Sequence, residues 1–191
     1  MQKLISYPLS FIVLVLVLLT LVVFHPIQWI CLHVFGYQAH KKSVDYLNLC
    51  LLRIGHLLGT TYKVDNREII PKGVPIIFVS NHQSLYDIIG IIWFLREFHP
   101  KFVSKKELSK GIPSVSYNLR HGGSVLIDRK DPKQAIPAIK GMSEYIEKNK
   151  RSAVIFPEGT RSKTGKTKEF AQSGLKILCK YAPSAYIVPI T

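Results

Sequence analysis

The residues from Leu4 to Phe24 form one apolar run without a charged side chain, and this run limits the possible folds more than any other feature. A helix over such a run is roughly 30 Å long, which matches the hydrocarbon core of a bilayer. A cleaved signal peptide fits less well, because the run is too long and no small-residue cleavage site follows His25 and Pro26. We therefore expect a membrane segment, either a transmembrane helix or part of a re-entrant hairpin.

The residues after this run carry the pattern of a membrane interface. Trp29, His33 and Tyr37 recur at every fourth position, so on a continuous helix they form one amphipathic aromatic stripe. Lys41 and Lys42 then end the apolar region. Basic residues favour the cytoplasmic side, so we expect the rest of the chain to be cytoplasmic.

The charge balance indicates an anionic partner. The chain has 26 Lys and Arg residues against 12 Asp and Glu residues, a formal net charge of +14. An anionic membrane surface or a phosphorylated metabolite fits this charge. Nucleic acid is not expected, because the basic residues do not gather into an arm or a helical stripe and no RNA-recognition or zinc-finger pattern is present. The three widely spaced cysteines indicate neither a disulfide framework nor a structural zinc site.

The 191 residues divide by pattern into three parts. Residues 1–42 are the membrane anchor, 43–72 an amphipathic helix with a connecting strand, and 73–191 a catalytic domain. The helix is predicted over 43–59 and the strand over 61–64. Whether the apolar stripe of the helix faces the core or the membrane stays open; it consists of Val44, Leu47, Leu51, Ile54 and Leu58.

Strand and helix patterns alternate through the third part. This alternation predicts an α/β fold with a mostly parallel sheet flanked by helices, whose site lies at the carboxyl ends of the strands. His82, Arg129 and Arg161 each follow such a strand. The predicted strands are 74–79, 101–104, 124–127, 153–156 and 186–190, and the predicted helices are 88–95, 132–148 and 169–181, with a weaker helical stretch after 111–113.

His82 and Asp87 form the most distinctive pair of titratable residues. An aspartate bonded to Nδ1–H of a histidine leaves Nε2 free to accept a proton. On a continuous helix, residues five apart point away from each other, so the two can meet only if His82 precedes the first helical turn. Ser84 as the N-cap, with Asp87 three residues later, gives that arrangement. The spacing also fits an Asp87 that only caps the helix.

Arginines and a glycine follow the later strands. Arg129 and Arg161 suit bidentate binding of a phosphate, and Gly159 allows backbone N–H groups to approach an oxyanion, although surface ion pairs would explain each arginine alone. A nucleotide-binding P-loop is disfavoured because five residues, not four, separate Gly159 from Gly165. The chain also lacks Gly-x-Ser-x-Gly, which leaves acyl chemistry without a covalent serine.

Four blocks, taken in order, resemble the glycerolipid acyltransferases, in particular the 1-acylglycerol-3-phosphate acyltransferases. The first block, 81–87, is similar to the His-x-x-x-x-Asp block of that family. The blocks 123–129, 156–162 and 187–190 are similar to its second, third and fourth. The resemblance covers about Gly73 to Thr191, and family members usually also carry an apolar N-terminal anchor. They usually continue beyond the fourth block, so the end of this chain at Thr191 departs from the pattern.

The resemblance implies transfer of a fatty acyl group from acyl-CoA or acyl-carrier protein to lysophosphatidate, giving phosphatidate in phospholipid biosynthesis. His82 would take the hydroxyl proton and Asp87 would orient it. No metal or redox cofactor is implied. The remaining roles fall to cationic and loop residues: Arg129 and Arg161 for the phosphate, Glu158, Gly159 and Thr160 for the shape of its pocket, and Lys105 for a carrier or phosphate contact.

Two alternatives stay open. The acceptor could instead be glycerol 3-phosphate or another lysophospholipid. The chain could also be a non-enzymatic protein that binds membrane surfaces through its basic face.

Overall fold

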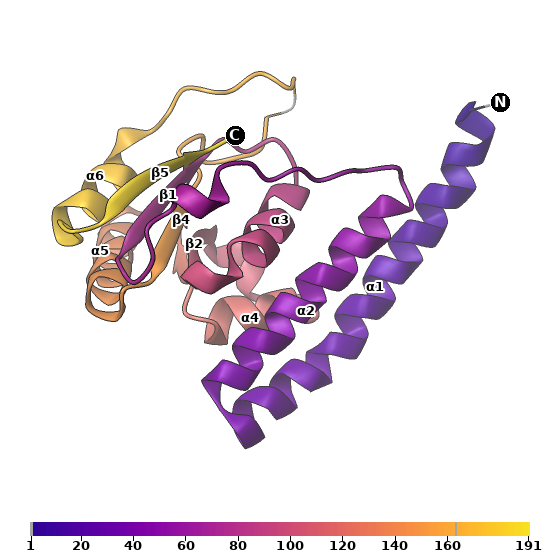
Figure 1. Cartoon of the computed structure of the whole chain (residues 1–191), viewed down its shortest axis with the longest axis horizontal. Coiled ribbons are helices and arrows are strands. Elements are labelled where there is room, and N and C mark those ends of the chain that lie inside the picture. The colour runs from indigo at the N-terminus through magenta and orange to yellow at the C-terminus, as the bar shows by residue number, and fades with distance from the viewer. Residues whose placement is uncertain (1, 163) are drawn as a thin grey trace.

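The computed structural model describes residues 2–162 and 164–191, with side chains from Ser6 onward. A long helical hairpin lies beside an α/β layer (Figure 1). Its arms are α1 (Gln2–Phe35) and α2 (Tyr37–His56). The chain reverses at Gly36, whose φ of 81° lies in the left-handed region that favours glycine.

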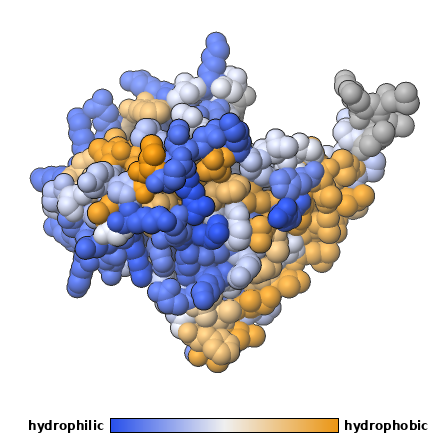
Figure 2. Space-filling model, in the orientation of Figure 1, coloured by the Kyte–Doolittle hydropathy of each residue, from blue (hydrophilic) through white to orange (hydrophobic). Residues whose placement is uncertain are grey.

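Helix α1 has the length and composition of a membrane span over Ser6–Phe35. Only 11% of its most apolar window is buried inside the protein. In Figure 2, hydrophobic side chains cover the exposed flank of the hairpin, whereas the α/β layer is mostly hydrophilic. A flank of this kind suits contact with lipid.

Most of the apolar stripe of α2 faces protein, but Leu58 lies beyond the helix end at His56 and is exposed. Leu47 and Leu51 are buried in one cluster with Leu21 of α1, and Ile89 and Val115 pack against that cluster. The stripe therefore holds α1 and α2 together and attaches the hairpin to the α/β layer. The predicted helix was placed too late in the chain, because α2 already begins at Tyr37.

The turn at Gly36 also separates the predicted aromatic stripe. Trp29 and His33 stack on α1 with ring centroids 4.6 Å apart. Tyr37 begins the next helix, and its hydroxyl accepts a hydrogen bond from Lys101 Nζ at 2.6 Å. The prediction of one stripe containing all three residues is wrong, because it required an unbroken helix.

All strand pairs of the described sheet are parallel, in the order β3-β2-β4-β1-β5. The predicted α/β fold with flanking helices is confirmed. The strands are β1 (Ile76–Ser80), β2 (Pro100–Lys105), β3 (Val125–Ile127), β4 (Ser152–Ile155) and β5 (Tyr186–Ile190). The other helices are α3 (Tyr86–Phe94), α4 (Val115–His121), α5 (Pro132–Asn149) and α6 (Gln172–Tyr181), with 3-10 helices at Arg67–Ile69, Arg96–Phe98 and Lys106–Ser109.

The two faces of the sheet bury separate cores. Ile77 contributes to one core with Ile146 of α5 and Leu178 of α6. Its neighbour Phe78 contributes to the other, with Ile91 of α3. This alternation follows from the two-residue period of a strand, and it explains why the strands read as continuous apolar runs.

Three details of the structure differ from the sequence-based expectations. Residues 61–64 form no strand. Their β-branched and aromatic side chains favour one, but no neighbouring strand is available for backbone pairing. Helix α3 begins at Tyr86 after Leu85, and not directly after Ser84. The predicted boundary at residue 42 falls inside α2.

Candidate active site

The turn between β1 and α3 brings His82 against Asp87. Asp87 Oδ2 accepts hydrogen bonds from His82 Nδ1 at 3.0 Å, Gln83 N at 2.8 Å and Ser84 N at 2.9 Å. Asp87 therefore does more than cap the helix, since one carboxylate oxygen holds both the imidazole and the backbone of the turn before α3. The contact is possible because His82 precedes the first helical turn.

These hydrogen bonds keep Asp87 ionised. Partial burial raises its pKa, but the bonds from the His82 side chain and from the Ser84 and Gln83 backbones together bring the pKa below its usual value. A carboxylate on Nδ1 selects the tautomer with a free Nε2. Within the described residues, Nε2 of His82 makes no hydrogen bond.

Phe156 fixes the plane of the His82 ring. The two rings stack with centroids 4.2 Å apart and planes 23° apart. The His82 side chain is 12% exposed. Sequence reasoning missed this role of Phe156. Its position directly after β4, beside the Glu-Gly-Thr-Arg segment, was the available signal.

Glu158 holds the backbone around His82. Its Oε1 accepts from His82 N at 2.8 Å, and its Oε2 accepts from Lys168 N at 3.0 Å. The Ser162 backbone N–H donates to His82 O at 2.8 Å. The loop after β4 thus packs around the turn that carries His82. Both oxygens of Glu158 accept hydrogen bonds from backbone N–H groups here, whereas sequence analysis assigned Glu158 to a phosphate pocket.

The cations of the site follow neighbouring strands. Lys105 ends β2 and pairs in register with Ile127, two residues before Arg129. The Arg129 guanidinium lies near Gly159, 3.8 Å from the position a Cβ would occupy there. Gly159 has a φ of 69°, which favours glycine. Partial burial lowers the pKa of Arg129, and Glu107 acts in the opposite direction.

Arg161 and Thr160 lie at the protein surface. Both are exposed in the loop after β4, as is Lys105 at the end of β2. The Arg161 carbonyl accepts from Lys168 Nζ at 3.0 Å, and the described residues provide no hydrogen bond to its guanidinium. The structure therefore brings Arg129 to Gly159 and leaves the Arg161 side chain free to meet a ligand.

A large groove adjoins the pair. Its volume is about 840 Å³, within the usual range for ligand sites. It runs from Asp87 and Asn81 along α3 and is lined by residues 61–67, 69, 70 and the last residues of β1 and β5. Aromatic and aliphatic walls, such as Tyr62 and Phe94, suit an apolar ligand. No cluster of three or more potential metal ligands occurs among the described residues.

The comparisons with known proteins agree with one another. A family model described as Acyltransferase matches residues 61–191. The 1-acyl-sn-glycerol-3-phosphate acyltransferase of Helicobacter pylori is 40% identical over 107 residues, which cover 54% of this chain and 43% of that protein. The chloroplastic 1-acyl-sn-glycerol-3-phosphate acyltransferase LPAT1 of Arabidopsis thaliana is 33% identical over 129 residues, covering 67% of this chain and 35% of that protein.

A solved structure is similar over nearly the whole chain. The PlsC 1-acyl-sn-glycerophosphate acyltransferase of Thermotoga maritima has a TM-score of 0.76 and 26% identity, and the match covers 95% of this chain and 72% of that one. The chain spans about two fifths of the first curated relatives that it matches, at 43% and 35%.

Proposed function

This chain belongs to the acyltransferase family, and from that premise we propose that it transfers a fatty acyl group to the free sn-2 hydroxyl of lysophosphatidate, giving phosphatidate for phospholipid synthesis. The donor is a thioester, acyl-CoA or acyl-carrier protein. The observation that carries the proposal is the contact between His82 and Asp87, with Asp87 also lining a groove of lipid size.

In the proposed reaction, Nε2 of His82 takes the proton of the acceptor hydroxyl as its oxygen attacks the thioester carbonyl. Asp87 holds the opposite nitrogen and stabilises the imidazolium that forms. The thiolate leaves and takes a proton, and the ester is released. A base of this kind contributes about 10² to 10⁴ in rate.

Binding of the lipid divides between the groove and the cations. The groove accepts an acyl chain, since its walls are largely apolar. Arg129 and Arg161 bind the acceptor phosphate, Gly159 and Thr160 shape that pocket, and Lys105 contacts the phosphate or the donor. These roles are inferred from the position of each residue after its strand.

Membrane association brings the acceptor to the site. Helix α1 has the composition of a membrane segment, and the net charge of +14 favours an anionic surface. Lys41 and Lys42 directly follow the hairpin turn, which favours a catalytic domain on the cytoplasmic side. A lipid acceptor then reaches His82 without leaving the bilayer surface.

A panel of acceptors with a labelled acyl thioester tests the reaction. We expect lysophosphatidate to be acylated in preference to glycerol 3-phosphate and to lysophospholipids with larger head groups. His82→Ala should abolish transfer while the folded state, measured by circular dichroism, persists. Unchanged transfer by this variant would refute the proposed base, and equal use of glycerol 3-phosphate would refute the proposed acceptor.

The phosphate role has a matched control. Arg161→Ala should raise KM for lysophosphatidate more than KM for the thioester. Arg53→Ala removes an exposed arginine of α2, outside the loops that follow the strands, and should change neither. An Arg161→Ala variant with both KM values unchanged would remove Arg161 from the phosphate site.

A further inference from the structure

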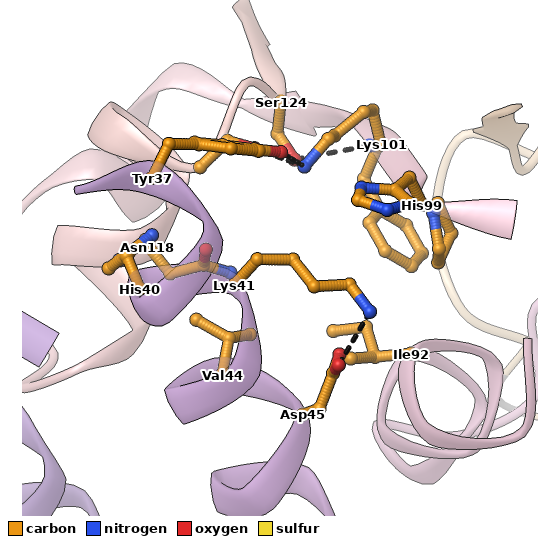
Figure 3. Close-up of a pocket in the computed structure, with 13 residues that line it drawn as sticks. Tyr37, His40, Lys41, Val44, Asp45, Ile92, His99, Lys101, Asn118 and Ser124 are labelled. Carbon is orange, nitrogen blue, oxygen red and sulfur yellow. Dashed lines mark hydrogen bonds and ion pairs between the residues drawn. The ribbon is translucent and has the colours of Figure 1, made fainter. Parts of the chain in front are cut away.

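A second polar chamber lies at the opposite end of the parallel strands from His82. It lies between α2 and the first residues of β2, with α4 beside it, is partly open to solvent, and has a volume of about 30 Å³. In Figure 3, Tyr37, Lys101 and His99 form one row, and Lys41 extends across from them toward Asp45. The proposed acyl transfer makes no use of this chamber.

Positive charge exceeds negative charge around the chamber. Lys101 is only 6% exposed, and its Nζ donates to the Tyr37 hydroxyl at 2.6 Å and to Gly122 O at 2.5 Å. Lys41 pairs with Asp45 at 2.5 Å. Among the described residues, Lys101 has no carboxylate partner. Arg151 adds another cation, with its guanidinium 5.1 Å from the centre of the Tyr37 ring.

The hydrogen-bond partners of the buried Lys101 are therefore neutral oxygens, and Asp45, which interacts with Lys101 at longer range, already pairs with Lys41. Burial lowers its pKa, and the hydroxyl of Tyr37 opposes that shift. Removing a charge from water costs several kcal/mol unless a counter-charge or full hydrogen bonding replaces the water. A small anion in the chamber would supply the missing charge.

Two histidines of the chamber wall have unused nitrogen atoms. His40 is fully buried, and neither Nδ1 nor Nε2 has a hydrogen-bond partner within the described residues. Nδ1 of His99 is also buried without a described partner. Burial, with the nearby cations, lowers the pKa of each to about 4, so both rings are neutral at pH 7. A neutral imidazole carries one N–H that can donate to an anion.

We propose that this chamber binds a small inorganic monoanion of the halide class. Size supports the choice, because about 30 Å³ takes two or three water-sized spheres, which is less room than the five heavy atoms of a phosphate or sulfate need. Charge supports it too, since water could satisfy His40 but would not neutralise Lys101. The available donors are the ring N–H groups and one remaining N–H on each ammonium. The other ammonium N–H groups already donate, those of Lys41 to Asp45 and Arg96 O and those of Lys101 to Tyr37 and Gly122 O.

The bound anion would join the hairpin to the α/β layer. Lys41 and His40 belong to α2, whereas His99 and Lys101 belong to the sheet side. A ligand that binds only the folded state stabilises it by an amount that grows with the logarithm of the ligand concentration above the dissociation constant. The expected effect is therefore a halide-dependent stability that leaves the chemistry at His82 untouched.

Thermal unfolding of the full chain in non-ionic detergent tests the proposal. Sodium bromide replaces sodium methanesulfonate at constant ionic strength, so that screening does not change. Tm should rise with the logarithm of the bromide concentration above the dissociation constant, by about 3–6 °C at ten times that constant. Lys101→Met should abolish the rise, whereas Lys148→Met, which removes an exposed lysine of α5, should retain it. A Tm that does not respond to bromide, or a Lys101→Met variant with the full response, would overturn the proposal.

Crystals of the unaltered chain soaked in bromide give a second readout that does not depend on the folding of a variant. An anomalous peak is expected between Lys101 and Lys41. A map at saturating bromide without a peak in the chamber would show that water alone fills it, and the halide site would be rejected.

Discussion

Acidification from pH 7.5 to pH 5 should weaken the docking of the hairpin, because His40 is neutral in the folded chain. His40 lies fully buried on α2 with its ring edge-on to Tyr117 of α4, at a centroid distance of 5.7 Å. Burial, and then the charges of Lys101 and His121, lower the pKa of His40 from 6.5 to about 4. Protonation in the folded state would place a cation beside Lys101.

The sign and size follow from proton linkage. The pKa of His40 is lower in the folded chain than in the unfolded chain. The contribution of neutral His40 to the free energy of unfolding is therefore fully present above pH 6.5 and is lost as the pH falls toward 4. At pH 5 the unfolded chain holds a proton on His40 that the folded chain lacks. This difference lowers the free energy of unfolding by about 2 kcal/mol. The full difference of about 2.5 pKa units would cost roughly 3.4 kcal/mol below pH 4. His99 has a similarly lowered pKa and acts in the same direction.

Urea unfolding in detergent at pH 7.5, 6 and 5, in halide-free methanesulfonate buffer, measures this loss. His40→Phe keeps a ring beside Tyr117 but does not titrate, so its free energy of unfolding should fall by about 2 kcal/mol less between pH 7.5 and 5 than that of the wild type. His56→Phe, at an exposed position of the same helix, is the matched control and should keep the wild-type slope. Equal slopes for the wild type and His40→Phe would refute the reasoning.

Three further outcomes are expected. Asp87→Asn should lower kcat by about 10² to 10⁴, measured as thioester-dependent transfer, and should add little in a His82→Ala background; an additive loss would separate the two residues. Glu158→Gln should lower kcat by up to about 10² with KM for lysophosphatidate nearly unchanged, because it loosens the backbone of His82; a rise in KM alone would instead support the phosphate pocket. Ile146→Ala, at a fully buried position, should cost about 2–5 kcal/mol in urea unfolding, whereas Lys148→Ala should stay within about 0.5 kcal/mol; equal losses would contradict the described core.

The regular elements of the α/β layer were predictable because each follows from local pattern. The strand ending at Ser80 is a short β-branched run, and Asp131 followed by Pro132 marks the start of α5, where the Asp131 side chain accepts from Lys133 N and Gln134 N. Signals of this kind act over a few residues and depend little on the rest of the fold.

The segment 61–64 shows where local pattern fails. Its residues favour a strand, but strand pairing needs a partner, and the chain uses these residues to line the groove. Gly36 had a similar effect on the aromatic stripe, since one positive φ directed Tyr37 away from Trp29 and toward Lys101.

The amino-acid sequence by itself determined the long apolar N-terminal helix, the alternation of strands and helices, and the delivery of His82, Arg129 and Arg161 to one edge of the sheet. Only the tertiary structure decided that Glu158 holds the backbone of His82, that Phe156 covers its ring, and that His40 and Lys101 share a buried chamber. The reason is the separation along the chain of the residues in contact. Hydrophobic periodicity and helix capping depend on near neighbours, whereas these contacts join residues 61 to 76 positions apart and exist only once the layers have packed.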